Sequence, residues 1–265
     1  MQKLRLAVAG CGFLGNIIVD AWKQGLLDEY EIVGVMGRTP EKAEAMAEKA
    51  GCPVCKNQQE LLDTKPDYIA EAASVPCMKE LAIPALEQGV SLAVLSIGAF
   101  ADPEFYEKVQ QAARKSGARV HIASGAIGGF DVLRTITLMG EASKQPVKAG
   151  IESKTCPQAF QKTSLFRPEL LETSEPAQIF GGNAKEAIAI LPARVNVAVA
   201  TSLATAGPDT DVNLYGLVGM VGDDHKITAE IPGVKTVVDT YSDTSAIAGW
   251  SVVALLRNLV SPIMF

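Results

Sequence analysis

The segment LRLAVAGCGFLG, residues 4–15, decides the fold. Its first six residues form a short apolar run, which is typical of a buried strand. The glycines that follow have the spacing Gly10-x-Gly12-x-x-Gly15, and apolar residues then recur at helical intervals over 16–24. A strand, a glycine-rich turn and a helix in this order begin a βαβ unit. The segment therefore predicts a turn that binds a dinucleotide.

Each glycine of the turn has a physical purpose. Gly10 permits the tight turn, Gly12 lets a pyrophosphate approach the backbone, and Gly15 lets the helix pack closely on the strand. The helix N-terminus offers N–H groups and the positive end of its dipole to the phosphates. We expect the cofactor contacts of this turn to come from Gly10, Gly12, Phe13, Leu14 and Gly15. The alternative is a glycine turn with a structural role only.

The residues after the second expected strand bear on the choice between NAD and NADP. NAD sites place an Asp or Glu there to hold the ribose hydroxyls. This chain has Gly37-Arg38-Thr39, and the first acidic residue is Glu41. Arg38 and Thr39 are therefore candidate cofactor contacts, and a guanidinium suits the 2′-phosphate of NADP. The sequence favours NADP, or tolerance of both cofactors; otherwise Arg38 is a solvated residue beside a helix.

Strand and helix signals alternate through the first half of the chain. This alternation predicts an α/β fold with a doubly wound parallel sheet of the Rossmann type. The second half changes to an α+β pattern dominated by antiparallel strands. We expect a dinucleotide-binding domain at 1–121, an α+β catalytic domain at 122–239, and a helix within 240–265 that packs back on the first domain. Strands are expected at 4–9, 31–36, 53–54, 68–72, 92–97, 118–123, 148–154, 211–218, 225–230 and 235–238, and helices at 16–24, 40–50, 77–88, 103–115, 129–142, 185–191, 194–206 and 245–259.

Composition limits the function classes. The 265 residues are 48% hydrophobic and 20% charged, which is ordinary for a soluble globular protein. A net charge of −6, without a basic block, argues against nucleic acid or a membrane surface as the main partner. No uncharged apolar run of about 18 residues occurs, and the apolar stretch before residue 10 is too short for a signal peptide. Five mostly scattered cysteines complete the pattern of a cytoplasmic protein.

Two histidines are the candidates for proton transfer near neutral pH. His121 lies inside an expected strand, where a structural histidine is the simpler interpretation. His225 follows Asp223 and Asp224 at a turn that enters a strand, and two neighbouring carboxylates would raise its pKa and orient its ring. His225 is therefore the candidate catalytic acid or base, with a structural role as the alternative.

The CPVC segment at 52–55 invites a metal or redox interpretation. A zinc site needs two more ligands at suitable spacing, and the neighbouring sequence has none. Residues 53–54 fit better as the short core of the third strand. Asp63 and Asp67 fit a loop, and Glu71 ends a strand. We therefore expect no metal site.

Several segments together resemble the L-aspartate dehydrogenase family. Their order and spacing hold over nearly the whole chain, and those of the second half are more specific than the glycine pattern. The segments are GCGFLG (10–15), EAAS (71–74), LSIGA (95–99) with Asp102, SGAIGG (124–129), GNAKEA (182–187), LPARVNV (191–197) and DDHKI (223–227).

The resemblance implies an N-terminal Rossmann domain, a C-terminal catalytic domain and a homodimer. It implies oxidation of L-aspartate with NAD or NADP, which releases ammonia through iminosuccinate and in some members serves NAD biosynthesis. By position, His225 would be the catalytic histidine, while Ala126 and Asn196 would contact the cofactor.

The chain departs from the family pattern around the expected substrate. LVGM at 217–220 replaces an Ala-Asp-Pro-like stretch, and Asp223 replaces an asparagine. These changes leave the substrate open between an amino acid and an oxo acid. A related reductase for another imine, oxo acid or aldehyde and a non-catalytic NADP-binding regulatory protein remain alternatives. Substrate carboxylates need cationic or N–H partners, for which Lys154, Arg194 and Lys226 are candidates.

Overall fold

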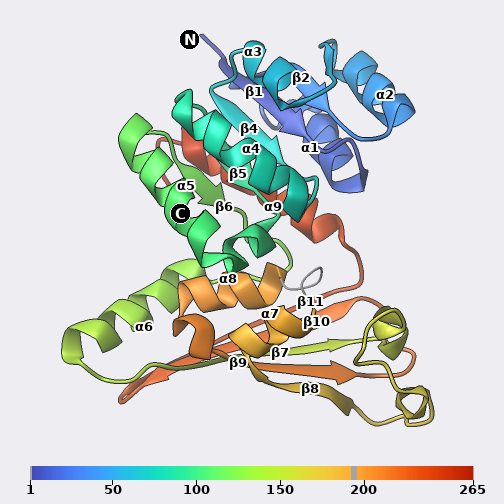
Figure 1. The fold of residues 1–265 in the computed structure, drawn as a ribbon, viewed down its shortest axis with the longest axis vertical. Helices are drawn as coiled ribbons and strands as arrows, with labels where there is room; N and C mark the ends of the chain where they lie inside the picture. Colours follow the sequence, from blue (N-terminus) through green and yellow to red (C-terminus); the bar gives the residue numbers. More distant parts are fainter. Residues whose placement is uncertain (1, 192–195, 265) are drawn as a thin grey trace. The chain divides into compact units, whose positions relative to one another are not determined.

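The computed structural model describes residues 2–191 and 196–264 of the chain. The chain divides into two compact units. The first unit is Met1–Gly125 together with Ala246–Phe265, and the second is Ala126–Ser245. Figure 1 follows the chain through both units. None of the helices in the described part of the chain has the length and apolar character that crossing a membrane requires.

The first unit is built around a parallel sheet. Its strands are β1 (Leu4–Ala9), β2 (Tyr30–Met36), β3 (Val54–Cys55), β4 (Tyr68–Glu71), β5 (Ser91–Val94) and β6 (Val120–Ile122). They lie in the order β3-β2-β1-β4-β5-β6, and all neighbouring pairs are parallel. The order reverses between β1 and β4. This is the switch point at which open α/β sheets bind their ligands.

Helices cover both faces of this sheet (Figure 1). They are α1 (Phe13–Lys23), α2 (Pro40–Ala50), α3 (Gln58–Asp63), α4 (Val75–Glu87), α5 (Pro103–Ser116), α9 (Ala246–Val260) and the short 3-10 helix η1 (Ile97–Ala101). The helix α9 comes from the end of the chain and packs on α1, while α4 packs on α5. The hydroxyl of the fully buried Tyr30 donates a hydrogen bond of 2.8 Å to the Leu256 carbonyl, which ties β2 to α9.

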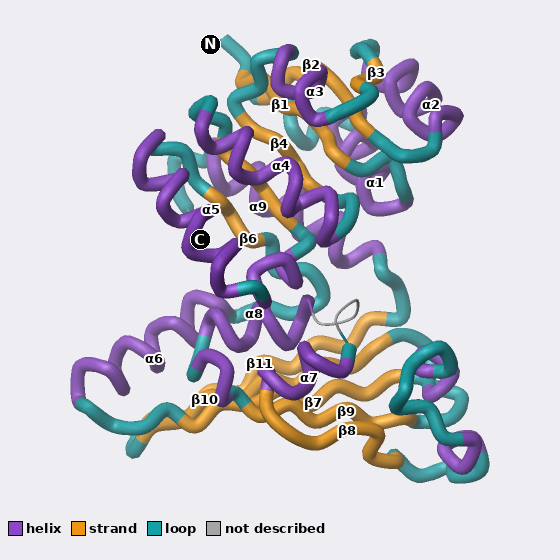
Figure 2. The backbone as a smooth tube through the Cα atoms, in the orientation of Figure 1, coloured by secondary structure: helices purple, strands orange, loops and turns teal. Residues whose placement is uncertain are grey.

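The second unit is a mixed sheet with helices on one face (Figure 2). Its strands are β7 (Lys148–Thr155), β8 (Ala177–Asn183), β9 (Asp211–Gly216), β10 (Asp223–Ile231) and β11 (Val234–Ser242). Its helices are α6 (Phe130–Ser143), α7 (Ala184–Ile190), α8 (Asn196–Ala204) and the 3-10 turns η2 (Pro157–Phe160), η3 (Pro168–Leu171) and η4 (Gly207–Asp209). The order is β11-β10-β7-β9-β8, in which β7 and β9 are parallel and the other neighbours antiparallel.

The predicted fold class is confirmed, since a doubly wound parallel sheet is joined to a second α+β unit. The sequence pattern does not predict α3 or β8, because α3 is only six residues long and β8 contains two adjacent glycines, which weaken a strand signal. The strand β10 begins at Asp223, so His225 lies within the strand and not at the turn before it. Of the helix expected at 194–206, the structure describes Asn196–Ala204, and Arg194 lies outside the described residues.

Candidate active site

Gly10 follows β1 in a turn that lies directly against the turn after β4. Its φ of +119° falls in the range that favours glycine. A Cβ at Gly10 would overlap the Ala72 carbonyl, and a Cβ at Gly15 would overlap the Gly10 carbonyl. A side chain at either position would therefore push the β1–α1 turn away from β4 or away from α1.

Gly12 is the N-cap residue of α1 and borders open space. Among the described residues, no side chain caps this end of the helix, and the first turn carries no acidic residue. The N–H groups at the start of α1, which include those of Phe13 and Leu14, therefore have no side-chain cap from the described residues and carry the positive end of the helix dipole, an arrangement that favours an anion. This geometry fits the pyrophosphate of a dinucleotide.

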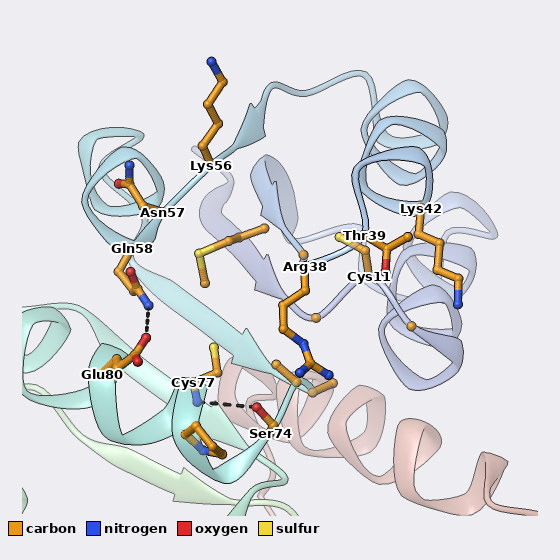
Figure 3. A pocket seen from close by; sticks show the side chains of 17 residues that line it. Cys11, Arg38, Thr39, Lys42, Lys56, Asn57, Gln58, Ser74, Cys77 and Glu80 are labelled. Carbon is orange, nitrogen blue, oxygen red and sulfur yellow. Dashed lines mark hydrogen bonds between the residues drawn. The ribbon is translucent and has the colours of Figure 1, made fainter.

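A cavity of about 440 Å³ adjoins this turn (Figure 3). Its walls follow the carboxyl ends of β1 to β4, where the switch point places a ligand. The predicted cofactor contacts that line it are Gly10, Gly12, Arg38 and Thr39. The predicted contacts in the first turn of α1 are not among its lining residues: Phe13, Leu14 and Gly15. Lining residues that the sequence pattern does not single out are Lys42, Lys56, Asn57, Gln58, Cys77 and Glu80.

Positive charge predominates among the lining residues of the cavity. Arg38, Lys42 and Lys56 supply it, while Glu80 is the acidic lining residue and accepts a hydrogen bond from Gln58 over 2.6 Å. Figure 3 shows the Arg38 side chain reaching toward the turn after β4, whereas Lys56 points away from it. The cavity therefore suits an anionic ligand with Arg38 beside it.

Glu71, the last residue of β4, is fully buried. Its carboxylate accepts hydrogen bonds from the Ala73 and Ser74 N–H groups and from both the N–H and the hydroxyl of Ser96, over 2.8–3.1 Å. Burial raises the pKa of Glu71, and the four donors oppose this rise because they stabilise the charged form. The carboxylate ties the turn after β4 to the end of β5. It thereby supports the surface against which Gly10 lies.

His225 lies on the helix-covered face of β10 in the second unit and is 9% exposed. It pairs across the sheet with Ser153 of β7, and the Ser153 Oγ lies 2.9 Å from the imidazole Nδ1. Within the described residues no hydrogen bond engages Nε2. Nε2 is therefore the ring nitrogen through which His225 can exchange a proton with a reactant.

The expected rise in the pKa of His225 is wrong. Burial lowers the pKa below the ordinary value of 6.5, and this effect outweighs the attraction of Asp223 and Asp224. Asp224 is also held by Lys154, whose ammonium lies 3.4 Å from its carboxylate. This shift favours the neutral imidazole, which is the form that accepts a proton.

The cations proposed for the substrate carboxylates do not gather at His225. Successive side chains of a strand point to opposite faces, so Lys226 lies on the other face of β10 and Lys154 on the other face of β7 from Ser153. The Lys154 ammonium is already paired with Glu152 and Asp224, over 3.2 and 3.4 Å. These two lysines therefore do not provide the carboxylate partners beside the histidine.

Two other predicted contacts belong to the second unit. Ala126 is its first residue, and Asn196 is the first residue of α8. Their contact with the cofactor stays a prediction.

His121 has structural surroundings. It lies in β6, its ring centroid is 6.1 Å from that of Tyr68, and burial lowers its pKa. The thiols of Cys52 and Cys55 are free, and burial raises the pKa of Cys52 to about 11. Protonated thiols are poor nucleophiles and poor metal ligands at neutral pH.

Two family models match the chain. Residues 10–123 match the model of the homoserine dehydrogenase NAD-binding domain, and residues 138–259 match the model of the aspartate dehydrogenase C-terminal domain. Together with the switch-point cavity, these matches define an oxidoreductase that uses NAD(P), with a Rossmann unit and a second α+β unit.

Full-length relatives define the family more narrowly. The L-aspartate dehydrogenase of Methanococcus maripaludis strain C6 is 30% identical to this chain over 267 residues, and the aligned region covers 98% of both proteins. That of Cupriavidus taiwanensis is 30% identical over 263 residues, covering 96% of this chain and 97% of its own. The chain belongs to the L-aspartate dehydrogenase family.

Solved structures show the same fold. The crystal structure of aspartate dehydrogenase from Thermotoga maritima covers 100% of both chains with a TM-score of 0.77 and 23% identity. The amine dehydrogenase of Mycobacterium smegmatis covers 98% of this chain and 93% of its own, with a TM-score of 0.59 and 16% identity. The two-unit architecture is therefore shared beyond the family.

The Glu71 carboxylate provides a first test. Glu71→Gln replaces one acceptor oxygen with an NH₂ group that faces buried donors. We expect it to lower the free energy of unfolding by about 1–3 kcal/mol, as measured by urea denaturation at pH 7. Glu44→Gln on the exposed side of α2 is the matched control, expected to change stability by less than about 0.5 kcal/mol. Equal stability of the two variants would contradict the role of Glu71.

Proposed function

We propose that this protein catalyses the NAD(P)-dependent oxidative deamination of L-aspartate, or the reverse reduction. The products of oxidation are iminosuccinate, which water converts to oxaloacetate, and ammonia. The names of the relatives support the substrate, and the glycine turn with its cavity supports the cofactor. His225 is the proposed acid–base residue. The observation that carries this role is a buried imidazole on a strand, with Nδ1 held by Ser153 and Nε2 free of hydrogen bonds from the described residues.

The two units divide the work in this proposal. When bound, the nicotinamide ring would accept the hydride that leaves the α-carbon of the unprotonated amino acid, and the proton that the nitrogen loses as the imine forms goes to solvent. The first unit holds the pyrophosphate at Gly10, Gly12 and the N-terminus of α1. The second unit supplies His225. The fold thus provides orientation and binding, which is the protein's share in reactions of this class.

His225 acts in the hydrolysis of the imine. Its neutral Nε2 removes a proton from the water molecule that adds to the imine carbon. The resulting imidazolium returns this proton to the nitrogen, which gives a carbinolamine. The imidazole then takes the hydroxyl proton of the carbinolamine and delivers it to the same nitrogen as the C–N bond breaks, the C=O bond forms and ammonia departs. Imine and water are consumed, oxo acid and ammonia are formed, and the imidazole is regenerated. A pKa below 6.5 suits this role because the basic form then persists through neutral pH.

We further propose that NADP is the preferred cofactor. Recognition of the NAD ribose needs a carboxylate near the end of β2, and this position is Gly37. A Cβ at Gly37 would lie 2.8 Å from the Cys11 Cβ, so the packing leaves no room for an acidic side chain. Arg38 follows directly and lines the cavity, where its guanidinium suits a 2′-phosphate.

The proposed base is tested by His225→Gln. We expect kcat for aspartate oxidation to fall by about 10²–10⁴-fold, because the variant loses its proton acceptor, while the Kd for NADPH stays the same. In the wild type, kcat is expected to decline on the acidic side, below the ordinary pH range of a histidine, because protonation of His225 removes the base. His121→Gln is the matched control and should keep its turnover. Full turnover of His225→Gln would refute the role.

Arg38→Ala tests the cofactor preference. Loss of a charge-assisted contact of about 1.5–3 kcal/mol should weaken NADPH binding roughly ten- to hundred-fold and leave NADH binding nearly unchanged. Titration of the intrinsic fluorescence measures both dissociation constants. Arg114→Ala, which alters an exposed arginine of α5, serves as the control. An unaltered ratio of the two affinities in Arg38→Ala would remove Arg38 from the site.

A further inference from the structure

In the second unit, the buried hydroxyl of Ser153 forms a hydrogen bond with the imidazole of His225. Ser153 of β7 is 7% exposed, and its Oγ lies 2.9 Å from Nδ1 of His225. The two residues are register partners on adjacent antiparallel strands, so their backbones hold them side by side. In the part of the chain that the structure describes, Ser153 Oγ has no other hydrogen bond. The hydroxyl is therefore committed to the imidazole.

We propose that Ser153 is a positioning residue that orients the His225 ring and serves all of its protonation states; this inference rests on the proposed function. A hydroxyl can both donate and accept a hydrogen bond. When Nδ1 carries the proton, it donates to Oγ, and Nε2 is left as the base. When Nε2 carries the proton, the hydroxyl rotates and donates to Nδ1.

The imidazolium is served by the same hydroxyl, because its Nδ1–H donates to Oγ. Both halves of the proposed imine hydrolysis can therefore proceed without rearranging the strands. A carboxylate in the place of Ser153 would instead favour the imidazolium and raise the pKa of the ring. The neutral hydroxyl orients His225 and leaves it unprotonated at neutral pH.

The surroundings of the ring contain few other groups that could take this role. The charged groups that act on His225, within the described residues, are Asp223 and Asp224 of its own strand. On the other side of β10, the register partner of His225 is Thr240 of β11.

The helix α6 packs on β10, and its buried side consists of Leu133, Ile136, Thr137 and Gly140. The hydroxyl of Thr137 donates to the Leu133 and Ala204 carbonyls, both within hydrogen-bond distance. Among the described residues, Ser153 is the one that hydrogen-bonds Nδ1.

The test compares Ser153→Ala with Ser153→Thr. In Ser153→Ala the imidazolium loses its acceptor, so the acidic limb of the kcat profile should move to lower pH, and kcat should fall by about 10- to 100-fold. The KM for aspartate and the Kd for NADPH should change less than about twofold, as expected when orientation and not binding is lost. Ser153→Thr keeps the hydroxyl and should restore both the rate and the profile. Ser202→Ala, a buried serine of α8, is the matched control.

A readout without turnover comes from nitrogen-15 NMR. The chain has two histidines, so in the His121→Gln background the imidazole signals of an untagged protein come from His225 alone. The titration should give a lower pKa for Ser153→Ala than for Ser153 or Ser153→Thr. An unshifted titration together with an unchanged kcat profile in Ser153→Ala, beside an inactive His225→Gln, would overturn the role of Ser153 alone. Full activity of His225→Gln would overturn the proposed function as well.

Discussion

The contact between Gly10 and Ala72 is the constraint on which the first unit depends. The turn after β1 can lie against the turn after β4 only without a side chain at position 10. Glu71 holds that second turn in place, because its buried carboxylate accepts hydrogen bonds from the turn and from Ser96. With both turns held, the N-terminus of α1 is aimed at the switch point of the sheet, and Gly12 faces open space. This packing leaves the start of α1 open to an anion.

In the second unit, the alternation of side chains along the strands determines which residues lie beside His225. Alternate residues of β7 and β10 face the helices, which brings Ser153 and His225 together in a buried setting. The residues next to them, Lys154 and Asp224, pair with each other on the opposite face. The charged groups are thereby separated from the imidazole by one step in the strand. Burial, and not local charge, then sets the direction of its pKa.

Much of the first unit could be predicted from the sequence because its signals are local. Glycine spacing locates the β1–α1 turn, and position after β2 finds Arg38, which lines the cavity. The Glu71 network and the Ser153–His225 pair have no such signal, because their partners are 25 and 72 residues apart. The sequence predicts the shift in the pKa of His225 in the wrong direction for a related reason. Neighbouring carboxylates are visible in the sequence, whereas burial is produced by tertiary packing.

Binding of NADPH to Gly12→Val tests the central claim most directly. The backbone of Gly12, with φ of −90° and ψ of −163°, accepts valine, and no protein atom lies within 4 Å of its Cβ position. The variant should therefore fold, with its side chain in the space assigned to the pyrophosphate. The account predicts an unfolding midpoint lower by no more than a few degrees, since valine is a poorer N-cap than glycine. It also predicts an affinity for NADPH weaker by roughly tenfold or more, about 1.4 kcal/mol at least. A folded Gly12→Val that binds NADPH with wild-type affinity would contradict it.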